Sequence, residues 1–169
     1  VNLIVHRSNP RLEADLAITA KHKVPLVITS LGAVPDLVKA VHGYGGLVFH
    51  DVISLRHAQK AAEAGVDGII AVAAGAGGHA GTMSPFALVS EIRRFFAGTI
   101  VLAGAISNGA QIAAAQLMGA DLAYLGTRFI ATTESMADPE YKAMLLRSQA
   151  ADILYTPAIS GVNANFMRE

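Results

Sequence analysis

A histidine set among glycines is the part of this sequence best suited to chemistry. The segment Gly75-Ala76-Gly77-Gly78-His79-Ala80-Gly81 directly follows the apolar run Gly68–Ala74. Glycine lets the backbone turn with positive φ and lets a ligand lie against the main chain. His79 is the only side chain of the segment that exchanges a proton near neutral pH. The pattern predicts a flat ligand on a glycine floor with proton chemistry beside it; a tight strand-to-helix turn with a surface histidine is the alternative.

Two later glycine corners have the composition of an anion site. They read Gly104-Ala105-Ile106-Ser107-Asn108-Gly109 and Gly126-Thr127-Arg128-Phe129. Main-chain N–H groups at such corners can point at a phosphate, and Asn108 begins a helical pattern whose positive end adds to the field. Thr127 adds a hydroxyl donor. We therefore predict a phosphate site here; glycines retained only for close packing are the alternative.

The segments around these motifs alternate between strand and helix patterns. Continuous apolar runs, typical of strands buried on both faces of a parallel sheet, cover Val1–Val5, Pro25–Thr29, Gly46–Phe49, Gly68–Ala73, Ile100–Ala105 and Leu122–Leu125. Helical periodicity covers Arg11–His22, Val34–Val41, Leu55–Ala64, Pro85–Phe96, Gly109–Met118 and Pro139–Ala151. The candidate residues all follow the carboxyl ends of predicted strands, where α/β folds collect their sites.

This alternation predicts an α/β fold. Strand starts recur every ~20–30 residues, the size of one βα unit, which fits a doubly wound sheet or most of an eight-stranded barrel. A phosphate site built by the loops after strands seven and eight is common in (β/α)₈ barrels. If the two glycine corners are those loops, residues 1–169 are strands 3–8 of one incomplete barrel domain. The start of the sequence inside the strand-like run Val1–Val5 agrees with this expectation.

Composition excludes several classes of protein. Apolar residues make up 53% and charged residues 15% of the 169 residues, which rules out a disordered chain. Thirteen basic and thirteen acidic side chains balance, so nucleic acid is not an expected partner. Two long uncharged stretches are broken by glycines and polar residues, so we predict no membrane span. No export signal is visible, and we expect a cytoplasmic protein.

Two further motifs do not carry a site. Gly75–Ala80 matches the dinucleotide pattern G-x-G-x-x-A, but no acidic residue ends the next strand, Ile100–Ala105. His50 and Asp51 resemble a metal-ligand pair, yet adjacent strand residues point to opposite faces. With no cysteine present, we predict no metal.

The ordered motifs resemble one known family. The runs Gly77–Gly81, Ala103–Ile106 and Gly119–Asp121, followed by Gly126–Thr132, are similar to those of the nitronate monooxygenases, which are FMN-dependent (β/α)₈ barrels. The resemblance implies FMN as cofactor and His79 as the catalytic residue beside the flavin. It also implies cofactor-binding roles for Asn2, Gly77, Gly78, Gly104, Ala105, Gly126 and Thr127.

Two positions depart from the pattern of this family. Family members often have glycine where Ala105 stands, and we expect alanine to be tolerated there only with a negative φ. Some relatives carry lysine where Asp51 stands, so the role of Asp51 is left open.

The resemblance implies oxidative denitrification of an alkyl nitronate, or of the parent nitroalkane, by FMN and O₂. A homodimer is left open. An FMN-dependent NAD(P)H reductase of quinones or of enoyl thioesters on acyl carrier protein is the nearest alternative, on the same barrel. A non-catalytic barrel that binds a phosphorylated metabolite is the alternative from another class.

Overall fold

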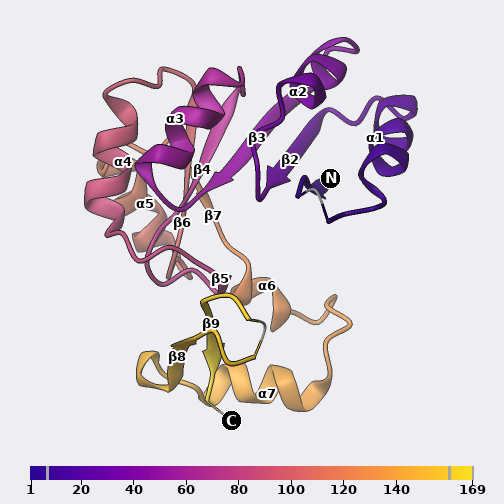
Figure 1. The fold of residues 1–169 in the computed structure, drawn as a ribbon. Coiled ribbons are helices and arrows are strands. Elements are labelled where there is room, and N and C mark those ends of the chain that lie inside the picture. Colours follow the sequence, from indigo (N-terminus) through magenta and orange to yellow (C-terminus); the bar gives the residue numbers. More distant parts are fainter. Residues whose placement is uncertain (7, 160, 169) are drawn as a thin grey trace.

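A parallel sheet of six strands forms the larger part of the molecule. The computed structural model describes residues 1–6, 8–159 and 161–168. The sheet contains β1 (Asn2–Ile4), β2 (Leu26–Ser30), β3 (Leu47–Val52), β4 (Gly68–Val72), β6 (Thr99–Ala103) and β7 (Leu122–Tyr124). The helices that connect these strands are α1 (Leu12–Lys21), α2 (Pro35–His42), α3 (Leu55–Glu63), α4 (Pro85–Arg93) and α5 (Gly109–Leu117), and they lie along the outer face of the sheet (Figure 1).

The strand order decides between the two predicted architectures. The order is β1-β2-β3-β4-β6-β7, and every neighbouring pair is parallel. A doubly wound sheet reverses its order at a switch point, and no reversal occurs among the described strands. The sheet therefore contains successive βα units of a (β/α)₈ barrel, as predicted, and its parallel carboxyl ends all lie at one edge.

Side chains of each strand alternate between the barrel interior and the helix layer. Val48 and Val52 belong to the main core between sheet and helices. Phe49 instead packs with Ile70 and Val101 in a second cluster on the interior face. Because the period of a strand is two residues, Asp51 shares the interior face with Phe49, and His50 faces the helices. The opposed directions predicted for His50 and Asp51 are confirmed.

Local helix signals agree with the structure in most places. Gly65 and Gly119 follow helices with φ of 84° and 100°, the left-handed conformation predicted for them. The Asn108 side chain accepts a hydrogen bond from the Gln111 amide in a capping box. Pro85 occupies the first turn of α4, but the Ser84 side chain makes no capping hydrogen bond.

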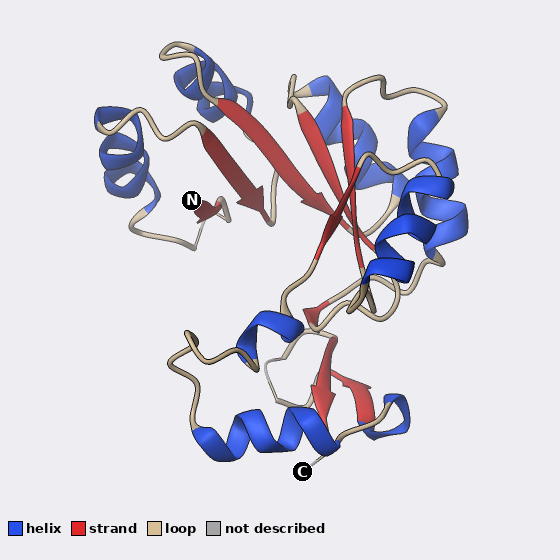
Figure 2. Ribbon diagram, turned by 180° about the vertical axis from the view of Figure 1, so that it is seen from behind, coloured by secondary structure: helices blue, strands red, loops and turns tan. Residues whose placement is uncertain are grey.

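The C-terminal segment is organised differently from the prediction. The expected helix Pro139–Ala151 ends earlier, as α7 (Pro139–Arg147), and is followed by the short helix η1 (Ala150–Asp152). The strands β8 (Ile153–Thr156) and β9 (Ala164–Met167) then form a hairpin, and β9 also pairs with β5 (Gly78–His79). Together with α6 (Thr127–Ile130), this segment lies across the carboxyl ends of the parallel strands (Figure 2). No helix among the described residues is long and apolar enough to cross a membrane.

Two aspartates in equivalent positions tie strand starts to neighbouring elements. Asp67 accepts hydrogen bonds from the Val48 amide at 2.7 Å and from His42 Nε2 at 2.8 Å. Asp121 accepts from the Ile100 amide at 2.7 Å and from an Arg93 guanidinium nitrogen at 2.7 Å. The repeated sequences Gly65-Val66-Asp67 and Gly119-Ala120-Asp121 thus form the same contact in two βα units: the aspartate accepts a hydrogen bond from a backbone amide of the preceding strand.

The substitution Asp121→Ala should lower the free energy of unfolding by about 1–2 kcal/mol at neutral pH, because the Ile100 amide loses its partner. The hydrogen bond from Ile100 and then the Arg93 guanidinium lower the pKa of Asp121. The ionised form is therefore the stabilising one. Its contribution is complete above the ordinary aspartate pKa and disappears as the pH falls through the lowered value.

Urea denaturation of the wild type and Asp121→Ala between neutral and acid pH measures this effect. The difference between them should shrink toward acid pH. Asp36→Ala is the control, because the exposed Asp36 only forms a surface ion pair, with its Oδ1 3.6 Å from Lys39 Nζ. Equal loss of stability in both variants would contradict the role given to Asp121.

Candidate functional site

Three loops at the carboxyl edge of the sheet meet at the glycine segment. The Ala105 amide donates to the Gly75 carbonyl at 3.0 Å, and a Cβ added to Gly75 would lie 2.9 Å from the Ala105 Cβ. A Cβ on Gly77 would lie 3.0 Å from Thr127 Oγ1. The loops after β4, β6 and β7 are therefore in contact, and glycine at these positions is what allows the close approach.

Ala105 adopts a left-handed backbone conformation, contrary to our expectation from the sequence. Its φ is 52°, so the expectation of a negative φ is wrong. The left-handed region costs a residue with a Cβ roughly 1–2 kcal/mol, and the hydrogen bond to Gly75 accompanies this strain. Because its amide is used within the protein, Ala105 shapes the corner and does not present a main-chain donor to a ligand.

The start of α5 also satisfies its own amides. Gln111 Oε1 accepts from the Ser107 amide at 2.6 Å and from the Asn108 amide at 3.2 Å. Asn108 begins the helix as predicted. The Ser107 and Asn108 amides nevertheless already donate to Gln111 Oε1. An anion bound at this corner would therefore be held mainly by side-chain donors.

Side-chain donors line a small cavity next to this corner. The cavity has a volume of 230 Å³, and its polar lining residues are Ser107, Thr127 and Arg128. Ser107 and Thr127 contribute hydroxyl groups and Arg128 contributes a guanidinium, a combination suited to an anion. A Cβ on Gly126 would meet open space within 4 Å. Arg128 was not predicted as a site residue from the sequence. Its position as a basic residue directly after Gly126-Thr127 could have indicated a role in binding an anion.

A larger cavity of 860 Å³ opens at the same edge and contains His79 in its lining. On the barrel side, Ile4, Ser30, Asp51 and Val72 line it. On the helix side, His57, Lys60 and Glu63 of α3 line it. His79 and Thr127 thus line two separate cavities. Gly77, which lies against Thr127, and Gly78 directly precede His79 in the chain.

A polar row crosses the interior face of β1, β2 and β3. Ser30 Oγ donates to Asp51 Oδ2 at 2.6 Å and lies 3.3 Å from Asn2 Oδ1. Asp51 Oδ1 is buried and has no hydrogen-bond partner among the residues that the structure describes. Burial raises the pKa of Asp51, and the Ser30 hydrogen bond opposes that rise in part. Asn2 was predicted from the resemblance; Ser30 was not identified from the sequence.

The other histidines of the larger cavity have different surroundings. His50 is buried with its Nδ1 2.7 Å from Thr29 Oγ1. Burial, and to a smaller extent the charge of His57, lower the pKa of His50 to about 4, so it is neutral at physiological pH. His6 Nδ1 lies 2.7 Å from Ser8 Oγ. His50 therefore packs as a neutral, hydrogen-bonded residue of the helix side.

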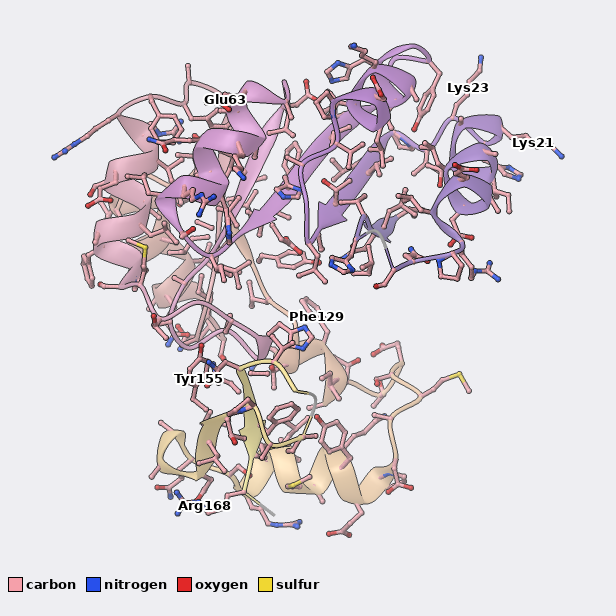
Figure 3. The ribbon with its side chains drawn as sticks, viewed as in Figure 1. Lys21, Lys23, Glu63, Phe129, Tyr155 and Arg168 are labelled. Atoms are coloured by element: carbon pink, nitrogen blue, oxygen red, sulfur yellow. The ribbon has the colours of Figure 1, made fainter. Side chains whose placement is uncertain are left out.

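The C-terminal hairpin holds the glycine segment in place. Gly78 pairs with Asn165 and His79 pairs with Ala164 across an antiparallel register. Asn165 Nδ2 donates to the Ala76 carbonyl at 2.7 Å, and the Tyr155 hydroxyl donates to the Ala80 carbonyl at 3.3 Å. Figure 3 shows Tyr155 between the hairpin and the carboxyl edge of the sheet. These contacts join residues far apart in the sequence, and no local sequence pattern indicated any of them.

Comparison with known proteins identifies relatives of this arrangement. The family model described as nitronate monooxygenase matches residues 5–169. A nitronate monooxygenase of Paraburkholderia phytofirmans is 34% identical over 164 residues, covering 91% of this chain and 45% of the relative. The chain thus spans about half the length of the curated relatives it matches.

Two solved structures share the fold closely. FabK from Thermotoga maritima superposes with a TM-score of 0.90 at 31% identity, covering 99% of this chain and 53% of that one. The nitroalkane oxidase from Streptomyces ansochromogenes superposes with a TM-score of 0.86 at 30% identity, covering 92% and 48%.

Replacing Asn165 with alanine should loosen the glycine segment. The Ala76 carbonyl would lose its 2.7 Å hydrogen bond, and local opening would become easier. Amide hydrogen exchange in residues 75–81 should accelerate by about 5- to 10-fold. Tyr155→Phe removes a longer bond and should have a smaller effect. Unchanged exchange in Asn165→Ala would show that the backbone pairing with β9 is sufficient.

Proposed function

Because the chain belongs to the nitronate monooxygenase family, we propose that the protein is an FMN-dependent enzyme that oxidises alkyl nitronates with O₂. The observation that carries the proposal is the position of His79, which lines the 860 Å³ cavity at the carboxyl edge of the barrel strands. This is the edge at which (β/α)₈ enzymes assemble their active sites. Family membership indicates an oxidoreductase, and the nitronate substrate is the finer part of the proposal.

The residues at the carboxyl edge fit a flavin. Gly77 and Gly78 provide a stretch without side chains directly before His79, and a Cβ on Gly77 would crowd Thr127 Oγ1 at 3.0 Å. Ser107, Thr127 and Arg128 line the small cavity that would take the phosphate. In this proposal Gly77, Gly78 and Asn2 contact the flavin, and Gly104, Gly126 and Thr127 surround its phosphate. Ala105 contributes shape only. A bound flavin would supply the electron acceptor.

His79 is the group we assign to proton chemistry. A neutral imidazole can take the α-proton of a nitroalkane, and an imidazolium can hold the negative charge of a nitronate. The pairing of Gly78–His79 with β9 fixes the backbone of this histidine. The protein therefore contributes the orientation of the substrate and a positioned proton carrier.

His79→Ala should lower nitronate turnover by about 100- to 1,000-fold, because the positioned donor that holds the negative charge of the nitronate is lost. The measurement is kcat/KM with the nitronate of a simple nitroalkane and purified, flavin-loaded protein. His22→Ala is the matched control, since His22 is an exposed residue at the end of α1. Equal rates for His79→Ala and the wild type would remove His79 from the mechanism.

Anaerobic reduction separates this proposal from its nearest alternative. Under the proposal, nitronate bleaches the flavin absorbance near ~450 nm and NADH or NADPH does not. Bleaching by NADH or NADPH alone would select the reductase instead. Colourless protein that takes up no flavin would favour a barrel that binds a phosphorylated metabolite. Cytoplasmic location and a homodimer stay predictions.

Arg128→Met should weaken binding of FMN and leave binding of riboflavin unchanged. The guanidinium lines the proposed phosphate cavity, and riboflavin lacks the phosphate. We expect a rise of about 10-fold in the FMN dissociation constant, measured by quenching of flavin fluorescence. Arg56→Met is the control because Arg56 is an exposed residue of α3. An equal loss of riboflavin and FMN binding would place Arg128 outside the phosphate site.

A further inference from the structure

A lysine of α7 binds two carbonyl oxygens of the segment that follows α6. Lys142 Nζ donates to the Thr132 carbonyl at 2.8 Å and to the Ser135 carbonyl at 2.6 Å, and both bonds are partly shielded from water. Thr132 is itself tied to α6, because its Oγ1 donates to the Phe129 carbonyl at 3.0 Å. The ammonium group therefore links α7 to α6 through the segment between them (Figure 1).

This polar link matters because α6 and α7 bury little apolar surface. None of the residues of these two helices is fully buried. The Asp138 side chain accepts from the Glu140 amide at 2.8 Å, but this contact only caps the start of α7 itself. Packing of an apolar face usually supplies most of the stability of a helix in a protein. Where that packing is weak, two hydrogen bonds from a charged donor take a larger share in placing the helix.

The face of α7 that carries Lys142 also forms one wall of the small cavity. Leu145 and Leu146 line this cavity of 230 Å³. Residues three and four positions apart share one face of a helix, so Lys142 lies on the same side of α7 as both leucines. Ala131, which directly precedes Thr132, lines the cavity from the end of α6. The two bonds of Lys142 therefore hold two walls of the cavity together.

We propose that Lys142 is a positioning residue that sets how long an anion stays in the small cavity, by holding α7 against the end of α6. The inference rests on the proposed function, which places the FMN phosphate in this cavity. Arg128 lines the cavity and supplies the charge that attracts the anion, whereas Lys142 acts through the leucine wall of α7. Loss of its two bonds lets α7 move away, so the anion should leave faster while its rate of arrival changes little.

Lys142→Met tests this role, because it keeps an unbranched apolar side chain and removes both hydrogen bonds. We expect FMN to dissociate about 10-fold faster from this variant, the effect of losing a hydrogen bond from a charged group. Riboflavin, which has no phosphate, should dissociate at the wild-type rate. Lys142→Arg keeps the charge and the donors and should restore most of the wild-type behaviour. The rates come from the recovery of flavin fluorescence after rapid dilution of loaded protein.

Lys39→Met is the matched control, since Lys39 is an exposed lysine of α2 whose Nζ lies 3.6 Å from Asp36 Oδ1. It should leave the dissociation of both flavins unchanged. Urea midpoints establish that each variant is folded. Lys142→Gln, whose side chain is uncharged and one atom shorter, carries the test if Lys142→Met is not folded.

Hydrogen exchange and salt separate positioning from a simple effect of charge. If Lys142 positions α7, amide exchange in residues 131–135 of Lys142→Met accelerates about 5- to 10-fold without any ligand. The faster dissociation of FMN then persists in about 0.5 M NaCl, which screens exposed charges. Slower association of FMN in Lys142→Met, with unchanged exchange and no effect in high salt, would show that only the charge matters and would overturn the proposal.

The outcomes keep this inference apart from the proposed function. Protein that takes up no flavin would end the proposed function, and inorganic phosphate would then test Lys142, with its exchange rate measured by ³¹P NMR line broadening. Equal phosphate exchange in the wild type and Lys142→Met, or no binding of phosphate to the wild type, would overturn the role of Lys142. An equal acceleration of FMN and riboflavin dissociation would overturn it as well.

Discussion

Parallel pairing of consecutive strands is the constraint on which the rest of this structure depends. Because each strand runs in the same direction as its neighbour, every loop that follows a strand emerges at one edge. The glycine segment after β4, the corner after β6 and the corner after β7 are therefore neighbours in space. Their close approach, with Gly77 against Thr127 and Gly75 against Ala105, is possible only where side chains are small or absent.

The two-residue period of the strands sorts the polar groups of β2 and β3 onto two faces. Thr29 and His50 pair on the helix side, where burial keeps the imidazole neutral. Ser30 and Asp51 pair on the interior side, within the barrel. Adjacent residues thus have different tasks: one pair completes the packing of the helix layer, and the other supplies the cavity with a polar wall. A shift of one residue in register would exchange these roles.

The C-terminal hairpin gives the glycine segment a defined shape. Four glycines in seven residues leave the segment with much conformational freedom in the unfolded chain. Strand pairing with β9 and the bond from Asn165 to Ala76 restrict that freedom from outside the segment. At the start of the segment, the Gly75 carbonyl accepts a hydrogen bond from the Ala105 amide, and Ala105 has a strained φ of 52°. The position of His79 is therefore a product of three separate parts of the chain.

The sequence by itself determined the βα periodicity, the fold class and the strand ends at which the candidate residues lie. Apolar runs such as Gly68–Ala73 and stop signals such as Gly65 and Gly119 are local, because they arise from propensity and backbone conformation within a few residues. The tertiary structure decided the pairing of β5 with β9, the conformation of Ala105 and the burial of Asp51 Oδ1, which has no hydrogen-bond partner within the described part of the chain. Each of these depends on contacts between distant residues. The bond from Asn165 to Ala76, for example, spans 89 positions, and no local pattern encodes which carbonyl a side chain will reach.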